Sequence, residues 1–132
     1  MSYSYTMKGF TYPDFHVTLK LSGSDLPTDM NQLQGLAVSQ DVNSANSVKL
    51  AEDGGEVLGV IFQAENGISQ GEGISVTVAL KGGYGVPYEG AAPAIGDKVV
   101  GAGSGKIKAG EAGHGRVWEV DSANKIAVVY FD

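Results

Sequence analysis

Apolar and polar residues alternate in short stretches along much of this chain, which is the pattern of β-strands. From Phe15 to Leu21 every second residue is apolar, and the same alternation recurs from Ile74 to Leu80. A period of two with many β-branched residues is typical of a half-buried strand. Single and paired glycines separate these stretches from further short extended segments. The pattern therefore predicts an all-β protein with about nine or ten short strands.

Most of the predicted elements are strands joined by polar or glycine turns. A five-residue polar loop, 121–125, separates two β-rich runs at the C-terminal end, which predicts a hairpin. Residues 26–34 are the exception, because Thr28 or Asp29 there could cap one or two helical turns. The predicted strands span 15–21, 35–38, 47–50, 57–62, 74–80, 86–88, 98–100, 106–108, 116–120 and 126–131. The fold class is a compact, glycine-rich antiparallel barrel or sandwich of short strands, and the pattern does not decide between these two.

Length and composition indicate one globular domain. The chain has 132 residues, of which 42% are hydrophobic, and this suffices for a core without covalent cross-links. The segments do not recur at a fixed period, which argues against a solenoid or a propeller. We expect a single β domain over residues 15–132, preceded by an extended N-terminal arm over residues 1–14.

The first fifteen residues, the arm and the residue after it, are rich in aromatics, which is unusual for a disordered tail. Tyr3, Tyr5, Phe10, Tyr12 and Phe15 are five of the eleven aromatics in the chain. Large aromatic side chains anchor interfaces. The arm is therefore predicted to pack either on its own domain or on a neighbouring subunit or partner, and these five residues are the candidate contacts.

Charge and signal content exclude several classes of partner. The formal net charge is −6 with only nine Lys and Arg residues, so neither a nucleic acid nor an anionic membrane is an expected partner. The chain has no cysteine, which excludes disulfides and thiolate chemistry. The N-terminal residues show no secretory signal, and no apolar run is long enough for a membrane helix.

No motif for catalysis or for a cofactor stands out. The two histidines, His16 and His114, are too few for a metal site and are predicted to be surface residues. The glycine-rich segment 101–107 lacks the spacing and the hydroxyl of a phosphate-binding loop and is predicted to be a hairpin turn. No pair of acids stands out among the fifteen, although a hydrolase that uses such a pair remains an alternative. We expect no cofactor, no metal and no enzymatic activity.

A series of short glycine-bounded segments resembles the capsid decoration (cement) proteins of tailed bacteriophages. The resemblance runs from Gly35 to the C-terminus. The segments that carry it are Gly35-Leu36-Ala37-Val38, Val48-Lys49-Leu50-Ala51, Val57-Leu58-Gly59-Val60, Ile74-Ser75-Val76-Thr77-Val78, Gly96-Asp97-Lys98-Val99-Val100 and Gly105-Lys106-Ile107-Lys108.

This resemblance implies a structural virion protein. Such a protein would be made in the host cytoplasm, assemble as a homotrimer or homodimer, and sit on the outer capsid surface. There it would bridge subunits of the major capsid protein and stabilise the head. An alternative from the residues themselves is a carbohydrate- or small-ligand-binding β module of a phage particle, in which Tyr84, Tyr88 and Trp118 form a stacking platform.

Overall fold

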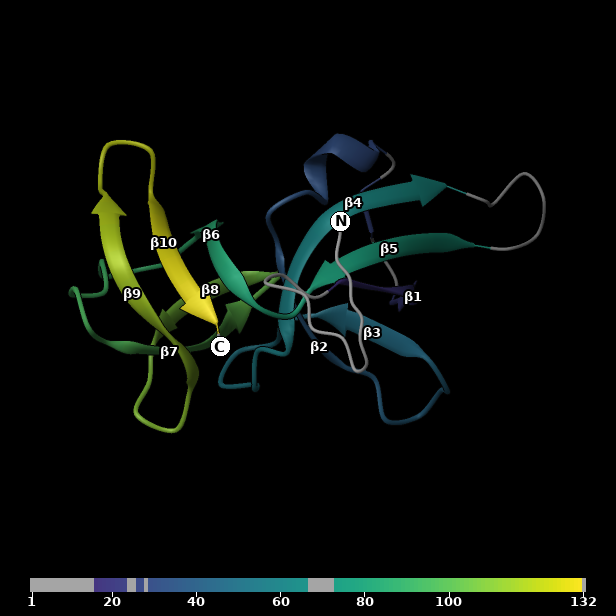
Figure 1. Ribbon diagram of the computed structural model, residues 1–132, viewed down its shortest axis with the longest axis horizontal. Coiled ribbons are helices and arrows are strands. Elements are labelled where there is room, and N and C mark those ends of the chain that lie inside the picture. The colour runs from purple at the N-terminus through teal and green to yellow at the C-terminus, as the bar shows by residue number, and fades with distance from the viewer. Residues whose placement is uncertain (1–15, 24–25, 28, 67–72, 132) are drawn as a thin grey trace, which may run out of the picture.

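The computed structural model describes residues 16–23, 26–27, 29–66 and 73–131, and this part of the chain is almost entirely β-structure. Two groups of strands lie side by side along the longest axis of the molecule (Figure 1). The elements are β1 (His16–Ser22), the short 3₁₀ helix η1 (Met30–Gln32), β2 (Ala37–Gln40), β3 (Ser47–Leu50), β4 (Gly59–Asn66), β5 (Ile74–Ala79), β6 (Gly82–Pro87), β7 (Lys98–Gly103), β8 (Lys106–Ala109), β9 (His114–Asp121) and β10 (Ile126–Phe131).

The first five strands form a closed barrel in the order β1-β3-β2-β4-β5. Strand β1 closes the barrel, because it pairs antiparallel with β5 and parallel with β3. Its alternating apolar residues face inward, and Leu21 is buried in the barrel core. The other members of that core are Leu33, Val38, Val48, Ile61, Ile74, Val76 and Val78. The barrel leaves no strand edge unpaired, so it offers no edge at which another chain could add a strand and aggregate.

The last five strands form a second sheet in the order β6-β10-β9-β7-β8. This sheet curls, so that its two edge strands approach each other. Tyr88, directly after β6, forms a parallel bridge with Ile107 of β8, and the N–H of Glu89 donates to the Ile107 carbonyl at 3.1 Å. The second sheet therefore almost closes into a barrel of its own.

The two sheets repeat the same architecture. The barrel runs β1-β5-β4-β2-β3 and returns to β1 through a parallel pair, and the second sheet runs β6-β10-β9-β7-β8 and returns through the parallel bridge. Each strand of the barrel thus has an equivalent five strands later. The ladder registers agree, and the equivalent buried positions are Leu21 with Tyr88, Val38 with Val99, Val48 with Ile107, Ile61 with Val117, and Val78 with Val129.

The repeat extends to an irregularity in the strands. In β4 the register shifts between Ile61 and Gln63, so Phe62 is an extra residue. In β9 the pairing passes from Val117 to Glu119 against consecutive residues of β10, so Trp118 is the extra residue. Both are β-bulges, and both put an exposed aromatic side chain on the outer surface.

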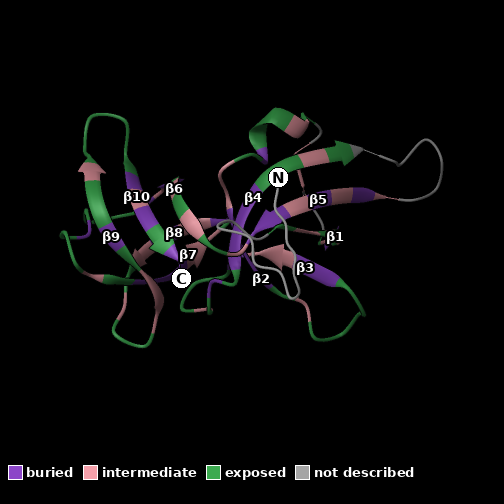
Figure 2. Cartoon of the chain, in the orientation of Figure 1, coloured by how far each residue is buried: buried purple, intermediate pink, exposed green. Residues whose placement is uncertain are grey.

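The two sheets share a hydrophobic core. Four buried residues from the barrel side pack with the interior of the second sheet, and buried positions continue through the strands of both groups (Figure 2). The barrel-side residues are Ala37, Ala51, Val57 and Val60, and the second-sheet residues are Val86, Tyr88, Val99, Ile107, Val117, Ala127, Val129 and Phe131. A shared core of this kind couples the stability of the two sheets.

The all-β prediction is confirmed. Of the two predicted arrangements, β1 to β5 form a closed barrel, and β6 to β10 form a second sheet. The hairpin with its turn at 121–125 is present, and so is the hairpin turn within 101–107. Asp29 caps the 3₁₀ helix, since its carboxylate accepts from the N–H of Asn31 at 3.0 Å. The predicted arm, residues 1–14, lies outside the described residues.

Four details of the prediction were wrong. The β1–β3 pair is parallel, because β1 must enter the barrel between β5 and β3 to close it. The glycine-rich segment 82–87 is itself a strand, and not a break before one. The apolar run 57–62 becomes a strand only from Gly59, and the segment at 35–38 only from Ala37.

In the described part of the chain no helix is long and apolar enough to cross a membrane.

Candidate functional site

The outer face of β10 is apolar, although it is not covered by any described part of the chain. Its inward residues, Ala127, Val129 and Phe131, are fully buried. Its outward residues are also apolar: Ile126 is 38% exposed, Tyr130 is 45% exposed and Val128 is half-buried. An antiparallel sheet with one face in water normally alternates apolar and polar residues. A strand that is apolar on both faces indicates that another surface covers it.

The bulge in β9 adds Trp118 to this face. Because of the extra residue, Trp118 and Glu119 both point outward, while Val117 is buried. Trp118 is 65% exposed, and its ring centroid lies 5.8 Å from that of Tyr130 on the neighbouring strand. Bulges are common where a strand re-aims a side chain next to a functional site. We name Trp118, Ile126, Val128 and Tyr130 the aromatic face.

Strand β6 leaves this face bare on its other side. Gly83 pairs with Tyr130 and Gly85 pairs with Val128, so neither position carries a side chain that could cover β10. A Cβ atom at Gly85 would lie 3.2 Å from the side chain of Ile126. The glycines therefore keep the apolar side chains of β10 accessible from the side.

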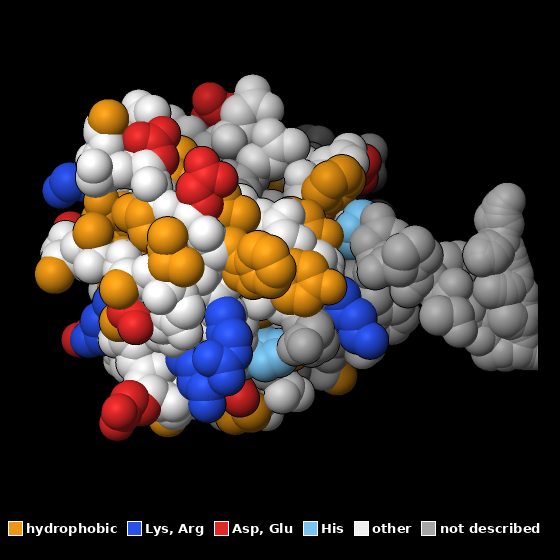
Figure 3. Space-filling view, turned by 60° about the vertical axis from the view of Figure 1, so that its left-hand side comes forward, with side chains coloured by type: hydrophobic (Ala, Val, Ile, Leu, Met, Phe, Trp, Pro, Cys, Tyr) orange, Lys and Arg blue, Asp and Glu red, His pale blue; other side chains and the backbone are white. Residues whose placement is uncertain are grey.

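A basic pocket adjoins the aromatic face. It has a volume of about 400 Å³, and Lys98, His114 and Arg116 line it together with Trp118 and Tyr130. Figure 3 shows hydrophobic side chains gathered across this side of the molecule, with Lys, Arg and His side chains next to them. Lys98 and Arg116 stand out as positive charges on a chain with a net charge of −6.

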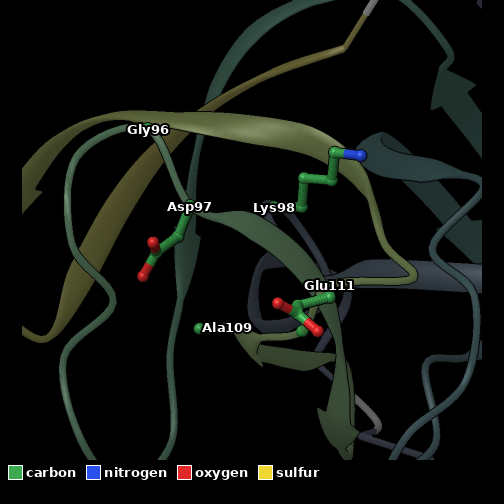
Figure 4. A pocket seen from close by; sticks show the side chains of 6 residues that line it. Gly96, Asp97, Lys98, Ala109 and Glu111 are labelled. Carbon is green, nitrogen blue, oxygen red and sulfur yellow. The ribbon is translucent and has the colours of Figure 1, made fainter.

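A second hollow, which we name the open slot, lies between β7 and the turn after β8. Its volume is about 430 Å³, and it is lined by Gly96, Asp97, Lys98, Ala109, Gly110 and Glu111. The Asp97 carboxylate accepts from the N–H of Ala94 at 2.9 Å and so closes the turn beside the slot. The side chain of Lys98 points away from Asp97 and Glu111 (Figure 4).

The open slot has an equivalent in the barrel. Three backbone hydrogen bonds of the barrel recur with nearly the same lengths around the slot. The N–H of Gly35 donates to the Ile61 carbonyl at 2.8 Å, and that of Gly96 donates to the Val117 carbonyl at 2.7 Å. The N–H of Ile61 donates to the Leu36 carbonyl, and that of Val117 donates to the Asp97 carbonyl, both at 2.9 Å. The N–H of Ala51 donates to the Ala37 carbonyl, and that of Gly110 donates to the Lys98 carbonyl, both at 2.9 Å. The equivalents of the six slot residues are Gly35, Leu36, Ala37, Leu50, Ala51 and Glu52, which we name the filled slot.

The ionised groups of the described surface are held by local contacts. A hydrogen bond from the Ser22 hydroxyl lowers the pKa of Asp41 below its usual value. Contact with the Lys106 ammonium lowers the pKa of Glu89, and the Asn124 side chain lowers that of Asp121. The Glu52 carboxylate raises the pKa of Lys49. Glu89 and Asp121 are exposed, and Asp41 and Lys49 are only partly buried, so these groups tune surface charge and not core stability.

The described residues offer no converging set of catalytic or metal-binding groups. Among them, no group of three His, Asp or Glu side chains could hold a metal ion. His16 stacks on Phe62 at 4.8 Å, and His114 lies 5.6 Å from Phe131 in the second sheet.

A comparison with known families, curated proteins and solved structures finds no match to this chain. Its function must therefore be argued from its own geometry.

The structure corrects the predicted stacking platform. Tyr88 is only 5% exposed and belongs to the core, and the Tyr84 hydroxyl donates to the Lys81 carbonyl at 2.8 Å while its ring packs on that core. Trp118 instead pairs with Tyr130, which sequence reasoning missed. Two signals were available: the spacing of three between Val117 and Val120, which reflects a bulge, and the absence of polar residues in 126–131.

The candidate contacts in the arm remain a prediction. Tyr3, Tyr5, Phe10, Tyr12 and Phe15 all lie outside the described residues.

Proposed function

We propose that this protein is a structural virion subunit that decorates the outer surface of a tailed-phage capsid and bridges subunits of the major capsid protein. The observation that carries the proposal is the aromatic face, a sheet surface that no described part of the chain covers and that is apolar where water would favour polar residues. The resemblance of the segments after Gly35 to capsid decoration proteins supplies the identity of the partner.

The composition of this face suits a protein partner. Trp, Tyr and Arg are the residue types enriched in the energetic centres of interfaces, and Trp118, Tyr130 and Arg116 lie together around one pocket. Lys98 and Arg116 at its margin favour an acidic patch on the partner. Such charges mainly steer the encounter and fix the orientation of the complex.

Substitution of Trp118 tests this docking surface. Trp118→Ala should weaken binding to heads assembled from the major capsid protein of the same phage by at least about 30-fold, the effect of losing an interface centre of about 2 kcal/mol. Co-sedimentation of the protein with heads measures the change. The matched control is Phe62→Ala, because Phe62 is the exposed bulge aromatic at the equivalent position of the barrel.

Phe62→Ala should bind as the wild type does. Normal decoration of heads by a folded Trp118→Ala, Tyr130→Ala double variant would show that the aromatic face is not the docking surface. Failure of the wild-type protein to bind heads at all would remove the capsid assignment itself.

The arm is a separate contribution to the same proposal. If Tyr3, Tyr5, Phe10, Tyr12 and Phe15 contact the capsid or a neighbouring subunit, deletion of residues 1–14 abolishes head binding and leaves a folded β domain. Circular dichroism checks the fold, and co-sedimentation checks binding. Normal decoration by the truncated protein would refute this role of the arm.

The basic pocket favours one alternative function, the binding of a carbohydrate with an acidic group. Trp118 could stack on a sugar ring while Lys98 and Arg116 pair with its carboxylate. A glycan array with neutral and acidic sugars tests this alternative. Binding of acidic glycans that Arg116→Ala abolishes would place ligand binding above capsid decoration, and no binding by any glycan would remove it.

A further inference from the structure

The filled slot of the barrel receives a hairpin from the second sheet. The tip of the β7–β8 hairpin enters it and forms backbone hydrogen bonds on both sides. Ala37 donates to the Gly105 carbonyl at 2.8 Å, and Gly105 donates to Ala51 at 3.2 Å. Gly101 donates to Gly55 and accepts from Gly54, each at 2.8 Å.

The fit of this hairpin requires glycine. A Cβ atom at Gly101 would clash with the carbonyl oxygen of Glu52, and one at Gly105 would lie 2.8 Å from the Cβ of Leu36. An ion pair closes the contact at its rim, where the Lys108 ammonium lies 2.5 Å from the Asp53 carboxylate. The internal contact thus consists of a hairpin in a slot, with a lysine of the hairpin paired to an acid next to the slot.

The chain carries a second copy of both parts. The open slot repeats the backbone positions of the filled slot, and the β2–β3 hairpin, residues 40–47, is the equivalent of the β7–β8 hairpin. One hydrogen bond differs: the N–H of Gly113, the equivalent of Gly54, donates to the Gly110 carbonyl at 3.0 Å. Among the described residues, no backbone hydrogen bond joins the β2–β3 hairpin to the open slot of the same chain. The β2–β3 hairpin also exposes Val42, which is 81% accessible.

The β2–β3 hairpin and the open slot are complementary in size. The β2–β3 hairpin has Gln40 where the β7–β8 hairpin has Gly101, and it contains no glycine, so it is bulkier. The open slot has the smaller residues Ala109 and Gly110 where the filled slot has Leu50 and Ala51. Lys98 replaces Ala37, but its side chain points away from Asp97 and Glu111 (Figure 4).

The charges are complementary as well. Lys49 is the equivalent of Lys108, and it sits on β3 at the base of the β2–β3 hairpin. Glu111 lines the open slot, next to the position that corresponds to Asp53. Within its own chain the Lys49 ammonium lies 2.7 Å from the Glu52 carboxylate. A hairpin seated as in the internal contact would bring Lys49 to Glu111 as a second acidic partner.

We propose that the open slot binds the β2–β3 hairpin of a second copy of this protein. The contact is head to tail, because the hairpin of one copy enters the slot of the next, and repetition of such a contact builds a closed ring or a filament. The open slot adjoins the basic pocket, because Lys98 lines both, but it contains no residue of the aromatic face. Self-association is measured without heads, so its outcome does not depend on binding to heads.

The test is self-association of the full-length protein, measured by sedimentation velocity from about 1 to about 100 μM, a range that covers weak to moderate interfaces. The wild type should form an oligomer. Ala109→Trp places a large ring in the slot, Val42→Asp places a charge at the hairpin tip, and both should be monomeric. Since Ala109 and Val42 are exposed, neither change disturbs the fold.

The controls are the same two kinds of change at exposed positions of the β9–β10 turn. Ala123→Trp and Ser122→Asp should associate as the wild type does. A charge reversal adds a second control: Glu111→Lys should weaken association.

A mixture of the two monomeric variants decides the geometry. The Val42→Asp copy keeps an intact slot and the Ala109→Trp copy keeps an intact hairpin, so the mixture should form dimers that stop at one contact. A monomeric wild type over the whole range, normal association of Ala109→Trp, or a mixture that stays monomeric would each overturn the proposal. Head binding measured on the same samples reports separately on the aromatic face.

Discussion

At the scale of single residues, glycine has two unlike roles in this protein. Gly101 allows two backbones to approach closely, since a side chain there would clash with Glu52 of the barrel. Gly83 instead leaves the outer surface bare, and the nearest atom to a Cβ there would be 3.8 Å away in Tyr130. The first role is a packing requirement, and the second concerns only the accessibility of the aromatic face.

This difference predicts opposite outcomes for the same substitution. Gly101→Ala should lower the free energy of unfolding by about 1–3 kcal/mol, because the added methyl group forces the hairpin out of the filled slot. Gly83→Ala should change it by less than about 0.5 kcal/mol. Urea denaturation followed by circular dichroism measures both. Equal stability of the two variants would contradict the close approach at Gly101.

At the scale of elements, the second sheet is closed by contacts between the end of β6 and β8. The Lys106 ammonium lies 3.1 Å from the Glu89 carboxylate, beside the bridge of Tyr88 with Ile107. This contact lowers the pKa of Glu89 below the ordinary value of 4.5. A carboxyl group with a lowered pKa stabilises the folded state at pH values above its ordinary pKa. This contribution is lost as the pH falls through the folded-state pKa.

The pair predicts a measurable titration. Lys106→Met should raise the pKa of Glu89 toward 4.5, and carbon-detected NMR of the side-chain carboxyl follows it directly. The contribution of Glu89 to the free energy of unfolding should then no longer fall as the pH drops below 4.5. Lys108→Met is the matched control, because Lys108 pairs with Asp53 and not with Glu89. A Glu89 pKa that is the same in all three proteins would show that the pair does not form in solution.

The bulge is the element that decides what the surface presents. In β9 it turns Trp118 outward beside Tyr130, and in β4 it turns Phe62 outward beside His16. The two bulges are equivalent, but their neighbours differ. In the second sheet the surrounding residues form the aromatic face and basic pocket, whereas Val60 at the position equivalent to Arg116 is buried in the shared core.

At the scale of the whole molecule, two copies of one architecture share a hydrophobic core. Val57 and Val60 belong to the barrel side and pack into the interior of the second sheet. The single tryptophan, Trp118, belongs to the second sheet, so its fluorescence reports on that sheet alone. Circular dichroism reports on the strands of both sheets.

This arrangement predicts one cooperative unfolding transition. Fluorescence and circular dichroism should give the same urea midpoint for the wild type. Val60→Ala should lower the free energy of unfolding by about 2 kcal/mol and move both midpoints together, because it opens a cavity in the shared core. Two separate midpoints would show that the sheets unfold independently.

The tandem arrangement also gives the molecule two ends that differ. One end exposes the β2–β3 hairpin, and the other exposes the open slot. A chain with unlike ends can join copies in series, which is one route to the oligomer expected of a capsid-decorating subunit. The aromatic face lies apart from the hairpin and remains available for another partner.

The repeat could have been found in the sequence, but only faintly. Val-Lys-Leu-Ala-Glu-Asp-Gly at 48–54 and Ile-Lys-Ala-Gly-Glu-Ala-Gly at 107–113 share lysine, glutamate and glycine at the same positions. The turns between the strands differ in length between the two halves, so no fixed period emerges. Equivalent positions became visible only when the ladder registers aligned them.

The sequence by itself determined that this protein is a glycine-rich all-β chain with hairpins at its C-terminal end, because alternation and turn chemistry act over neighbouring residues. Only the tertiary structure decided that β1 closes a barrel, that Tyr88 is buried while Trp118 is exposed, and that a hairpin fills one slot and leaves its equivalent open. These features arise from pairings between residues far apart in the chain. The free energy of each pairing depends on which distant segments come into contact, and the local pattern of apolar and polar residues does not determine this.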